Sequence, residues 1–186
     1  MKFNMGCGRR KLAGYINVDA SEQCDPDQVI DLERTPWPWP SDVATEVRFI
    51  HSLEHLGGDP KVFLAMMQEL YRVASDGCEI VIHVPHPRHD NFLGDPTHVR
   101  PITEQLLSLF DRSLNDAWKE AGGANTPLAH YTGVDFEIVS RRIILDEPYF
   151  GQLQRGEVSE AEMARLVRTH NNIARELQLV LRARKS

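Results

Sequence analysis

Met1-Lys-Phe-Asn-Met-Gly-Cys-Gly8 and, after a short bridge, Gly14-Tyr-Ile-Asn-Val-Asp19 are the two segments around which this sequence is organised. In each segment a short apolar run is typical of a strand, and the bridge is long enough only for a very short crossover. Gly6 and Gly8 form a turn after the first predicted strand, where the missing Cβ atoms let backbone N–H groups approach a ligand closely. Asp19 ends the second predicted strand. Ligands of open α/β sheets bind beyond the carboxyl ends of the strands, where an acid can bind ribose hydroxyls.

The glycine pattern differs from the fingerprint of dinucleotide-binding proteins. That fingerprint has a third glycine and an acid about 20 residues further on. Here the third glycine is missing, and Asp19 follows Gly6 by only thirteen residues. The pattern therefore favours a smaller ligand that has a ribose but no phosphates to hold. A purely structural turn remains an equal alternative on this pattern alone.

Composition limits the class of protein. The chain has 186 residues, of which 41% are hydrophobic and 26% charged, as expected for one globular domain with a full core over residues 1–186. No apolar run approaches the roughly 20 residues that span a bilayer, and no signal peptide is recognisable, so we expect a cytoplasmic protein without membrane association. The net charge of −6 makes nucleic acid an unlikely partner. Three cysteines without a C-x-x-C spacing indicate neither disulfides nor a cysteine zinc site.

The order of predicted elements indicates an α/β fold with a doubly wound sheet. The predicted strands are residues 2–5, 15–18, 28–32, 46–50, 78–84, 136–145 and 176–184, and the predicted helices are residues 60–73, 103 to 110 or 118, and 159–171. We expect the strand at 78–84 to be buried and the strand at 176–184 to lie at the sheet edge. Residues 122–130 are predicted to be a linker. Residues 35–40 are an extended loop because their alternating prolines prevent helix formation and strand pairing. Its two tryptophans either shield a pocket or cap the sheet.

A long polar loop follows the strand at 78–84. Loops of this length and polarity are usually functional or disordered, and prolines and Phe92 argue against disorder. Its side chains include ligand types suited to zinc or another divalent ion. They are His86, His89, Asp90, Asp95 and His98. Their spacing matches no compact ligand motif, so a metal site is an alternative hypothesis and our main prediction contains no metal.

Taken together, the motifs resemble class I S-adenosylmethionine-dependent methyltransferases, and more narrowly the small type 11-like branch of bacterial and phage proteins. The resemblance covers residues 2 to 110, and the alternation beyond is similar to the last two antiparallel strands of that family. The motifs that carry it are Asn4-x-Gly-Cys-Gly8, Gly14-Tyr-Ile-Asn-Val-Asp19, Val29-Ile-Asp-Leu32, Pro36-Trp-Pro-Trp39, His51-Ser-Leu-Glu-His-Leu56, Val84-Pro-His86 and Asp95-Pro-Thr-His98.

The resemblance implies a Rossmann-like, mostly parallel sheet with an antiparallel C-terminal strand, a truncated N-terminus and S-adenosylmethionine as cofactor. It implies that residues 1–110 form the cofactor half and residues 111–186 the substrate side. The cofactor-binding residues it implies are Asn4, Gly6, Cys7, Gly8, Asp19, Asp31, Leu32 and His51. Asp19 corresponds to the acid that takes both ribose hydroxyls, and Asp31 with Leu32 to the pair that reads the adenine. Asn4 departs from the family, which often has an acid there.

Methyl transfer to a hydroxyl needs a base, and histidine has a suitable pKa. The candidate catalytic residues are His51, His86 and His98. His55 is a weaker candidate, oriented by Glu54, and His83 is expected to point into the sheet. The acceptor is expected to be a small molecule or sugar with an oxygen or nitrogen nucleophile. A homo-oligomer or a partner chain could close the site, as could the loop at 85–100. A catalytically silent binding protein with the same fold remains an alternative.

Overall fold

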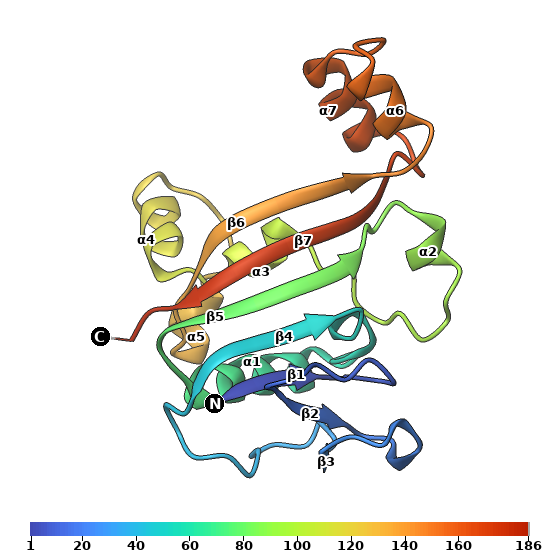
Figure 1. The fold of residues 1–186 in the computed structure, drawn as a ribbon. Coiled ribbons are helices and arrows are strands. Elements are labelled where there is room, and N and C mark those ends of the chain that lie inside the picture. Colours follow the sequence, from blue (N-terminus) through green and yellow to red (C-terminus); the bar gives the residue numbers. More distant parts are fainter. Residues whose placement is uncertain (186) are drawn as a thin grey trace.

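The computed structural model describes residues 1–185, and within them the central feature is one sheet. It has seven strands in the order β3-β2-β1-β4-β5-β7-β6 (Figure 1). The strands are β1 (Lys2–Met5), β2 (Ile16–Asp19), β3 (Gln28–Val29), β4 (Ala44–Ile50), β5 (Ala74–Pro85), β6 (Phe136–Leu145) and β7 (Ala174–Ala183). β7 is antiparallel to both of its neighbours, and the other pairs are parallel. The predicted α/β, Rossmann-like sheet with an antiparallel C-terminal strand is confirmed.

The strand order reverses beside β1. From β1 the chain moves to β2 and β3 on one side, and then returns to β4 and β5 on the other. In open α/β sheets such a switch point leaves a crevice outside the carboxyl ends of the two central strands, where ligands bind. The carboxyl ends of β1 and β4 are therefore where a site is expected.

The crossover from β1 to β2 has no helix, as its length predicts. Two buried asparagines shape it instead. The Asn4 side-chain amide donates to the Arg10 carbonyl and to Asn17 Oδ1, both at 2.9 Å, and Asn17 Oδ1 also accepts from the Leu12 backbone N–H at 2.8 Å. Because both side chains are buried, these hydrogen bonds replace water and fix the path of the bridge.

The helices lie mainly after β4. They are α1 (Pro60–Val73), α2 (Asp90–Leu93), α3 (Glu104–Ser108), α4 (Arg112–Glu120), α5 (Leu128–Thr132), α6 (Tyr149–Gln154) and α7 (Glu160–Thr169), with 3-10 turns η1 (Glu22–Cys24) and η2 (Leu53–His55). α1 begins as predicted, because the Asp59 side chain accepts from the Lys61 N–H at 2.7 Å and Pro60 occupies the first turn. No helix in the described residues is long and apolar enough to cross a membrane.

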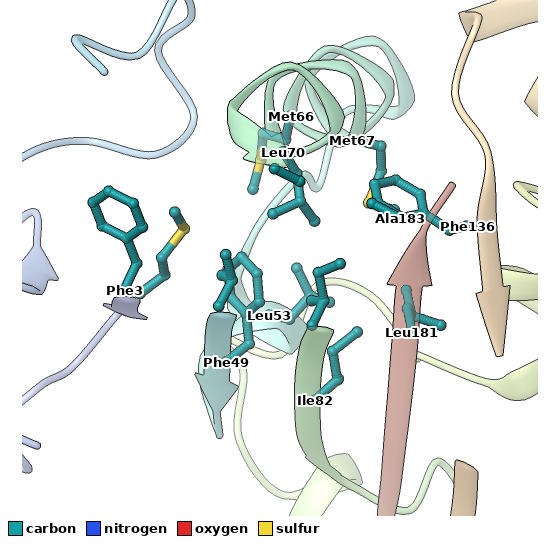
Figure 2. Close-up of a cluster of buried hydrophobic side chains, with 14 of the residues drawn as sticks. Phe3, Phe49, Leu53, Met66, Met67, Leu70, Ile82, Phe136, Leu181 and Ala183 are labelled. Carbon is teal, nitrogen blue, oxygen red and sulfur yellow. The ribbon is translucent and has the colours of Figure 1, made fainter. Parts of the chain in front are cut away.

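The main core lies between α1 and one face of the sheet. Figure 2 shows Met66 and Leu70 of α1 on the side of Phe49 of β4 and Ile82 of β5, and Met67 beside Phe136 and Ala183. A second, smaller core is formed around α6 and α7 at the end of the β6–β7 ribbon (Figure 1). Its buried members are Met163, Val167, Ile173 and Ala174.

The opposite face of the sheet is less covered, and this corrects two predictions. In β5, Val81 and His83 are half-buried and Glu79 is exposed, so the strand is buried on one face only. β7 is not at the edge, because it lies between β5 and β6 and leaves β6 outermost. In β7 the buried Leu177, Leu179 and Leu181 alternate with half-buried or exposed residues. Alternation of apolar and polar residues along a strand shows that one face of the strand is buried. It does not show whether the strand has one or two neighbours, because interior strands of this sheet alternate too.

Other differences are local. Of the two ends predicted for the helix that starts at residue 103, the one near residue 110 is confirmed and the one at 118 is wrong. α3 ends at Ser108, and Asp111 caps the separate helix α4 by accepting from the Leu114 N–H. α5 begins inside the predicted linker and ends two residues beyond it, and α6 was not predicted. Trp37 and Trp39 are buried in the main core, where Trp39 packs on Phe3 with ring centroids 4.5 Å apart. They therefore stabilise the sheet and do not line the cavity described next.

Candidate functional site

A cavity of about 300 Å³ opens at the switch point. It contains six of the eight residues predicted to bind the cofactor, contributed by the ends of β1, β2 and β4 and by the loop after β3. Its lining residues are Gly6, Gly8, Asp19, Ala20, Ile30, Asp31, Leu32, His51, Ser52, His55 and Leu56. Two carboxylates, aliphatic side chains and a glycine turn thus face one space, which is an arrangement suited to a ligand with a polar sugar and an apolar ring.

Asp19 is held in position by the backbone on either side of it. Its Oδ2 accepts from the Gly8 N–H at 2.8 Å, and its Oδ1 accepts from the Ser21 N–H at 3.0 Å. A carboxylate has about four lone-pair positions, so two remain after these bonds. Asp19 can therefore accept from two further donors while the glycine turn keeps it oriented.

Gly6 brings the ends of β1 and β4 unusually close together. A Cβ atom at Gly6 would lie 2.5 Å from Ser52 Cβ, and the φ angle of Gly6 is +66°. Ser52 Oγ donates to the Met5 carbonyl at 2.7 Å and fixes this approach. Gly8 also has a positive φ, of +50°, but an added Cβ would meet no described atom within 4 Å. Ser52 therefore occupies the space where a side chain of residue 6 would lie, whereas the corresponding space at Gly8 is open to a ligand.

The loop after β3 presents Asp31 and Leu32. Asp31 Oδ1 accepts from the Glu33 N–H at 3.0 Å, and Oδ2 lies 3.0 Å from Arg34 Nε. The carbonyl of the buried Leu32 accepts from Trp37 Nε1 at 3.0 Å, so one of the core tryptophans anchors this loop.

Two predicted cofactor residues lie beside the cavity without lining it. Asn4 is buried and its side chain is engaged by the bridge described above. Cys7 is also buried, with Sγ 3.3 Å from the Gly8 carbonyl, and this burial raises the pKa of the thiol. The geometry gives both side chains contacts that support the glycine turn.

His51 lines the cavity and has a partner that sequence analysis missed. It follows β4 with a φ of +54°, in the left-handed region that a residue with a side chain seldom adopts. Its Nε2 lies 2.9 Å from Glu176 Oε2 of β7, and its Nδ1 lies 3.8 Å from Glu54 Oε1. Glu176 carried no local signal, because it became relevant only when β7 paired beside β5 and placed it opposite Pro85.

The other predicted catalytic histidines do not line the cavity. His86 is half-buried, its Nδ1 accepts from the Arg88 N–H at 3.3 Å, and burial lowers the pKa of its ring. His98 packs against His55, with ring centroids 4.6 Å apart, and so adjoins the cavity through that residue.

The structure does not gather the five loop residues of the metal hypothesis into one set. His89 uses both ring nitrogens elsewhere, since Nδ1 accepts from the Asn91 N–H at 3.0 Å and Nε2 lies 2.9 Å from Asp146 Oδ2. Among the described residues, one group of potential ligands, Glu54, His55 and His98, has its ligand atoms within 4.8 Å of one another. Only His98 belongs to the predicted set.

No protein-family model matches the sequence, and no curated protein matches it. Solved structures do match. A methyltransferase dependent on S-adenosylmethionine from Archaeoglobus fulgidus has a TM-score of 0.64 and 19% identity, with 97% of this chain and 85% of that one covered. One from Methanosarcina mazei has a TM-score of 0.57 and 13% identity, with 99% and 92% covered. The (4+2)-cyclase SpnF has a TM-score of 0.55 and 13% identity, with 100% and 75% covered. The chain therefore has the Rossmann-like fold of class I methyltransferases.

Proposed function

We propose that this protein is an S-adenosylmethionine-dependent methyltransferase. The observation that carries the proposal is the convergence of Gly6, Gly8, Asp19, Asp31, Leu32 and His51 on one cavity at the switch point of the sheet. They come from separate strands, and their roles follow from the order of motifs along the chain. The fold shared with methyltransferases supports the same reading.

The residues present suit this cofactor. Asp19 has two acceptor positions left for the ribose hydroxyls, and Gly8 leaves the space beside it free of a side chain. Ile30, Leu32 and Leu56 give the cavity an apolar part that matches an adenine ring. When bound, S-adenosylmethionine supplies a methyl group on a sulfonium that is an excellent leaving group. The protein then contributes mainly alignment of acceptor and methyl, which can supply roughly 7–11 kcal/mol of the barrier.

His51 is the candidate for removing a proton from an acceptor hydroxyl. Its Nε2 is oriented by Glu176, which leaves Nδ1 as the nitrogen that can accept the proton. A histidine held by a carboxylate through its second nitrogen is a common arrangement for a general base. The acidic net charge of −6 favours a small polar molecule or sugar over nucleic acid as the acceptor.

Binding of S-adenosylhomocysteine, measured by calorimetry, tests the proposal without knowledge of the acceptor. We expect the wild-type protein to bind it and Asp19→Ala to bind at least tenfold more weakly. The physical reason is that hydrogen bonds to a charged acceptor contribute about 1.5–3 kcal/mol each, and about 1.4 kcal/mol corresponds to tenfold in affinity.

The matched control is Glu22→Ala, which removes an exposed carboxylate of η1 that does not line the cavity. Its affinity should remain within twofold of wild type. Failure of the wild-type protein to bind, or unchanged binding by a folded Asp19→Ala variant, would overturn the proposal.

A second candidate is a protein that binds the cofactor without transferring a methyl group. The observation that favours it is the likeness to SpnF, a cyclase with the same fold, since one fold can carry different chemistry. Incubation with methyl-labelled cofactor and a panel of small hydroxyl and amine acceptors separates the two. Transfer of label to any acceptor supports the methyltransferase. Tight cofactor binding without transfer to any of them supports the second candidate.

A further inference from the structure

Three side chains with metal-binding groups meet beside the cavity. Glu54 and His55 belong to η2, directly after β4, and His98 comes from the loop that precedes α3. One oxygen of Glu54 and one ring nitrogen of each histidine lie within 4.8 Å of one another. The two segments are tied together by the backbone, because the Glu54 carbonyl accepts from the N–H groups of Val99 at 3.0 Å and Arg100 at 3.1 Å.

Within residues 1–185 the carboxylate of Glu54 has no hydrogen-bond partner. The residue is 1% exposed, and both carboxylate oxygens are buried without a donor among the described residues. Burial raises the pKa of Glu54. A buried carboxylate normally receives hydrogen bonds or a cation, because removing it from water is otherwise very costly. His55 and His98 each have a ring nitrogen close enough to share a cation with it, and His51 Nδ1 also lies 3.8 Å from Glu54 Oε1.

In both histidines Nδ1 has a hydrogen-bond partner, and His98 Nε2 lies 3.8 Å from Asp95 Oδ2. His98 Nδ1 lies 2.9 Å from the Phe92 carbonyl, which can only accept, so Nδ1 carries the proton and Nε2 has the lone pair. His55 Nδ1 lies 2.9 Å from Thr97 Oγ1, whose own hydrogen is donated to Asp95 Oδ1 at 2.6 Å. The hydroxyl therefore accepts from His55 Nδ1, and this Nε2 also has a lone pair. Metal-binding histidines are typically fixed in this way by a carbonyl or carboxylate behind them.

We propose that Glu54, His55 and His98 bind a divalent transition-metal ion. Two imidazoles and one carboxylate are the protein ligands of many zinc sites that keep an open position, and the same set binds iron(II). In a tetrahedral zinc site with bonds of about 2.1 Å the ligand atoms are about 3.4 Å apart. The three ligand atoms here lie within 4.8 Å of one another, so binding would shorten each distance between them by at most about 1.4 Å.

The site adjoins the cofactor cavity through His55, which lines it. If the proposed function holds, an ion here would be placed to coordinate the acceptor oxygen and lower the pKa of its hydroxyl. Metal binding itself does not depend on that function. It can therefore fail while cofactor binding succeeds, and the reverse also holds.

The test is a titration of Co²⁺ into tag-free full-length protein that has been treated with chelator, followed by visible absorption and by competition with Zn²⁺. We expect one ion per chain and displacement by Zn²⁺. His98→Ala and Glu54→Gln should each weaken binding at least 100-fold. Thr97→Val, which removes only the hydroxyl behind His55, should weaken it about tenfold, as losses of outer hydrogen bonds do.

The control is His130→Gln. His130 is an exposed histidine of α5, hydrogen-bonded to Asp116, and its loss should leave the affinity within twofold. Circular dichroism establishes that each variant is folded. Absence of one-to-one binding by the wild-type protein overturns the proposal. Wild-type affinity in folded Glu54→Gln or His98→Ala does so as well, and Thr97→Val decides the matter if those two variants do not fold.

Discussion

The two ends of β4 carry glutamates in opposite environments. At the amino end, Glu46 receives hydrogen bonds from Tyr15, at 2.5 Å, and from Arg48, at 2.7 Å, and Lys2 lies 2.9 Å from it. At the carboxyl end, Glu54 is more deeply buried and its carboxylate has no donor among the described residues. Both residues are carboxylates close to the same strand, so the difference comes from their surroundings.

The pKa shifts of Glu46 and Glu54 follow from these contacts. Burial alone would raise the pKa of Glu46, but the hydrogen bonds from Tyr15, Lys2 and Arg48 outweigh it and lower the pKa to about 2. Burial of Glu54 raises its pKa, because its own backbone N–H and the neighbouring histidines offset the burial only in part. A satisfied carboxylate contributes to stability, whereas an unsatisfied buried one costs stability and is expected where function requires it. The amino end of β4 therefore stabilises the sheet, and the carboxyl end belongs to the candidate site.

The largest loss of stability should come from a substitution at the closest contact near the carboxyl end of β4. Gly6→Ala would place a Cβ atom 2.5 Å from Ser52 Cβ at a φ of +66°, so we expect a loss of about 3 kcal/mol or more in the free energy of unfolding. Urea denaturation measures it. Gly8→Ala is the matched control, since its φ is also positive but no described atom lies within 4 Å, and it should cost about 1–2 kcal/mol. Equal losses in the two variants would contradict the steric explanation.

A smaller loss of stability should come from a substitution near the amino end of β4. The shift of the Glu46 pKa corresponds to roughly 3–4 kcal/mol at about 1.4 kcal/mol per unit. We expect Glu46→Gln to lose about 2 kcal/mol of this in the free energy of unfolding at pH 7, because the glutamine side-chain oxygen still accepts a hydrogen bond. In the folded protein the pKa of Glu46 is about 2, against an ordinary 4.5. Its contribution is therefore fully present above pH 4.5 and is lost as the pH falls toward 2.

Urea denaturation at pH 7 and pH 3 should accordingly show the difference between wild type and Glu46→Gln shrink by more than half. Glu79→Gln is the control, since Glu79 is opposite Glu46 on the neighbouring strand but exposed, with Arg182 at 3.7 Å. An exposed pair of this kind contributes less than about 1 kcal/mol. A pH-independent difference for Glu46→Gln would refute the assigned network.

The smallest change in stability should be a gain and not a loss. With chelator present, Glu54→Gln should raise the free energy of unfolding by about 1 kcal/mol, because a buried amide without partners costs less than a buried carboxylate. Thermal unfolding in the presence of EDTA measures this. A clear loss of stability would mean that the carboxylate has a stabilising partner, and the contrast between the two ends of β4 would disappear.

Part of the candidate site followed from the sequence because it depends on local order. Gly6 and Asp19 each stand just after a predicted strand and Asp31 stands near the end of one, and parallel strands bring their carboxyl ends to one edge. Once the α/β class was predicted, these residues had to gather there. The start of α1 and the extent of β6 were equally local, fixed by a cap and by alternation.

The sequence by itself determined the α/β class, the glycine turn and the acids of the cavity, because periodicity and chain order encode which face of an element is buried and where it ends. Only the tertiary structure decided that β7 lies inside the sheet and gives Glu176 to His51. It also decided that His98 joins Glu54 and His55 and that the tryptophans belong to the core. These contacts join segments far apart along the chain, and no local pattern specifies which of several compatible neighbours a strand or loop will pack against.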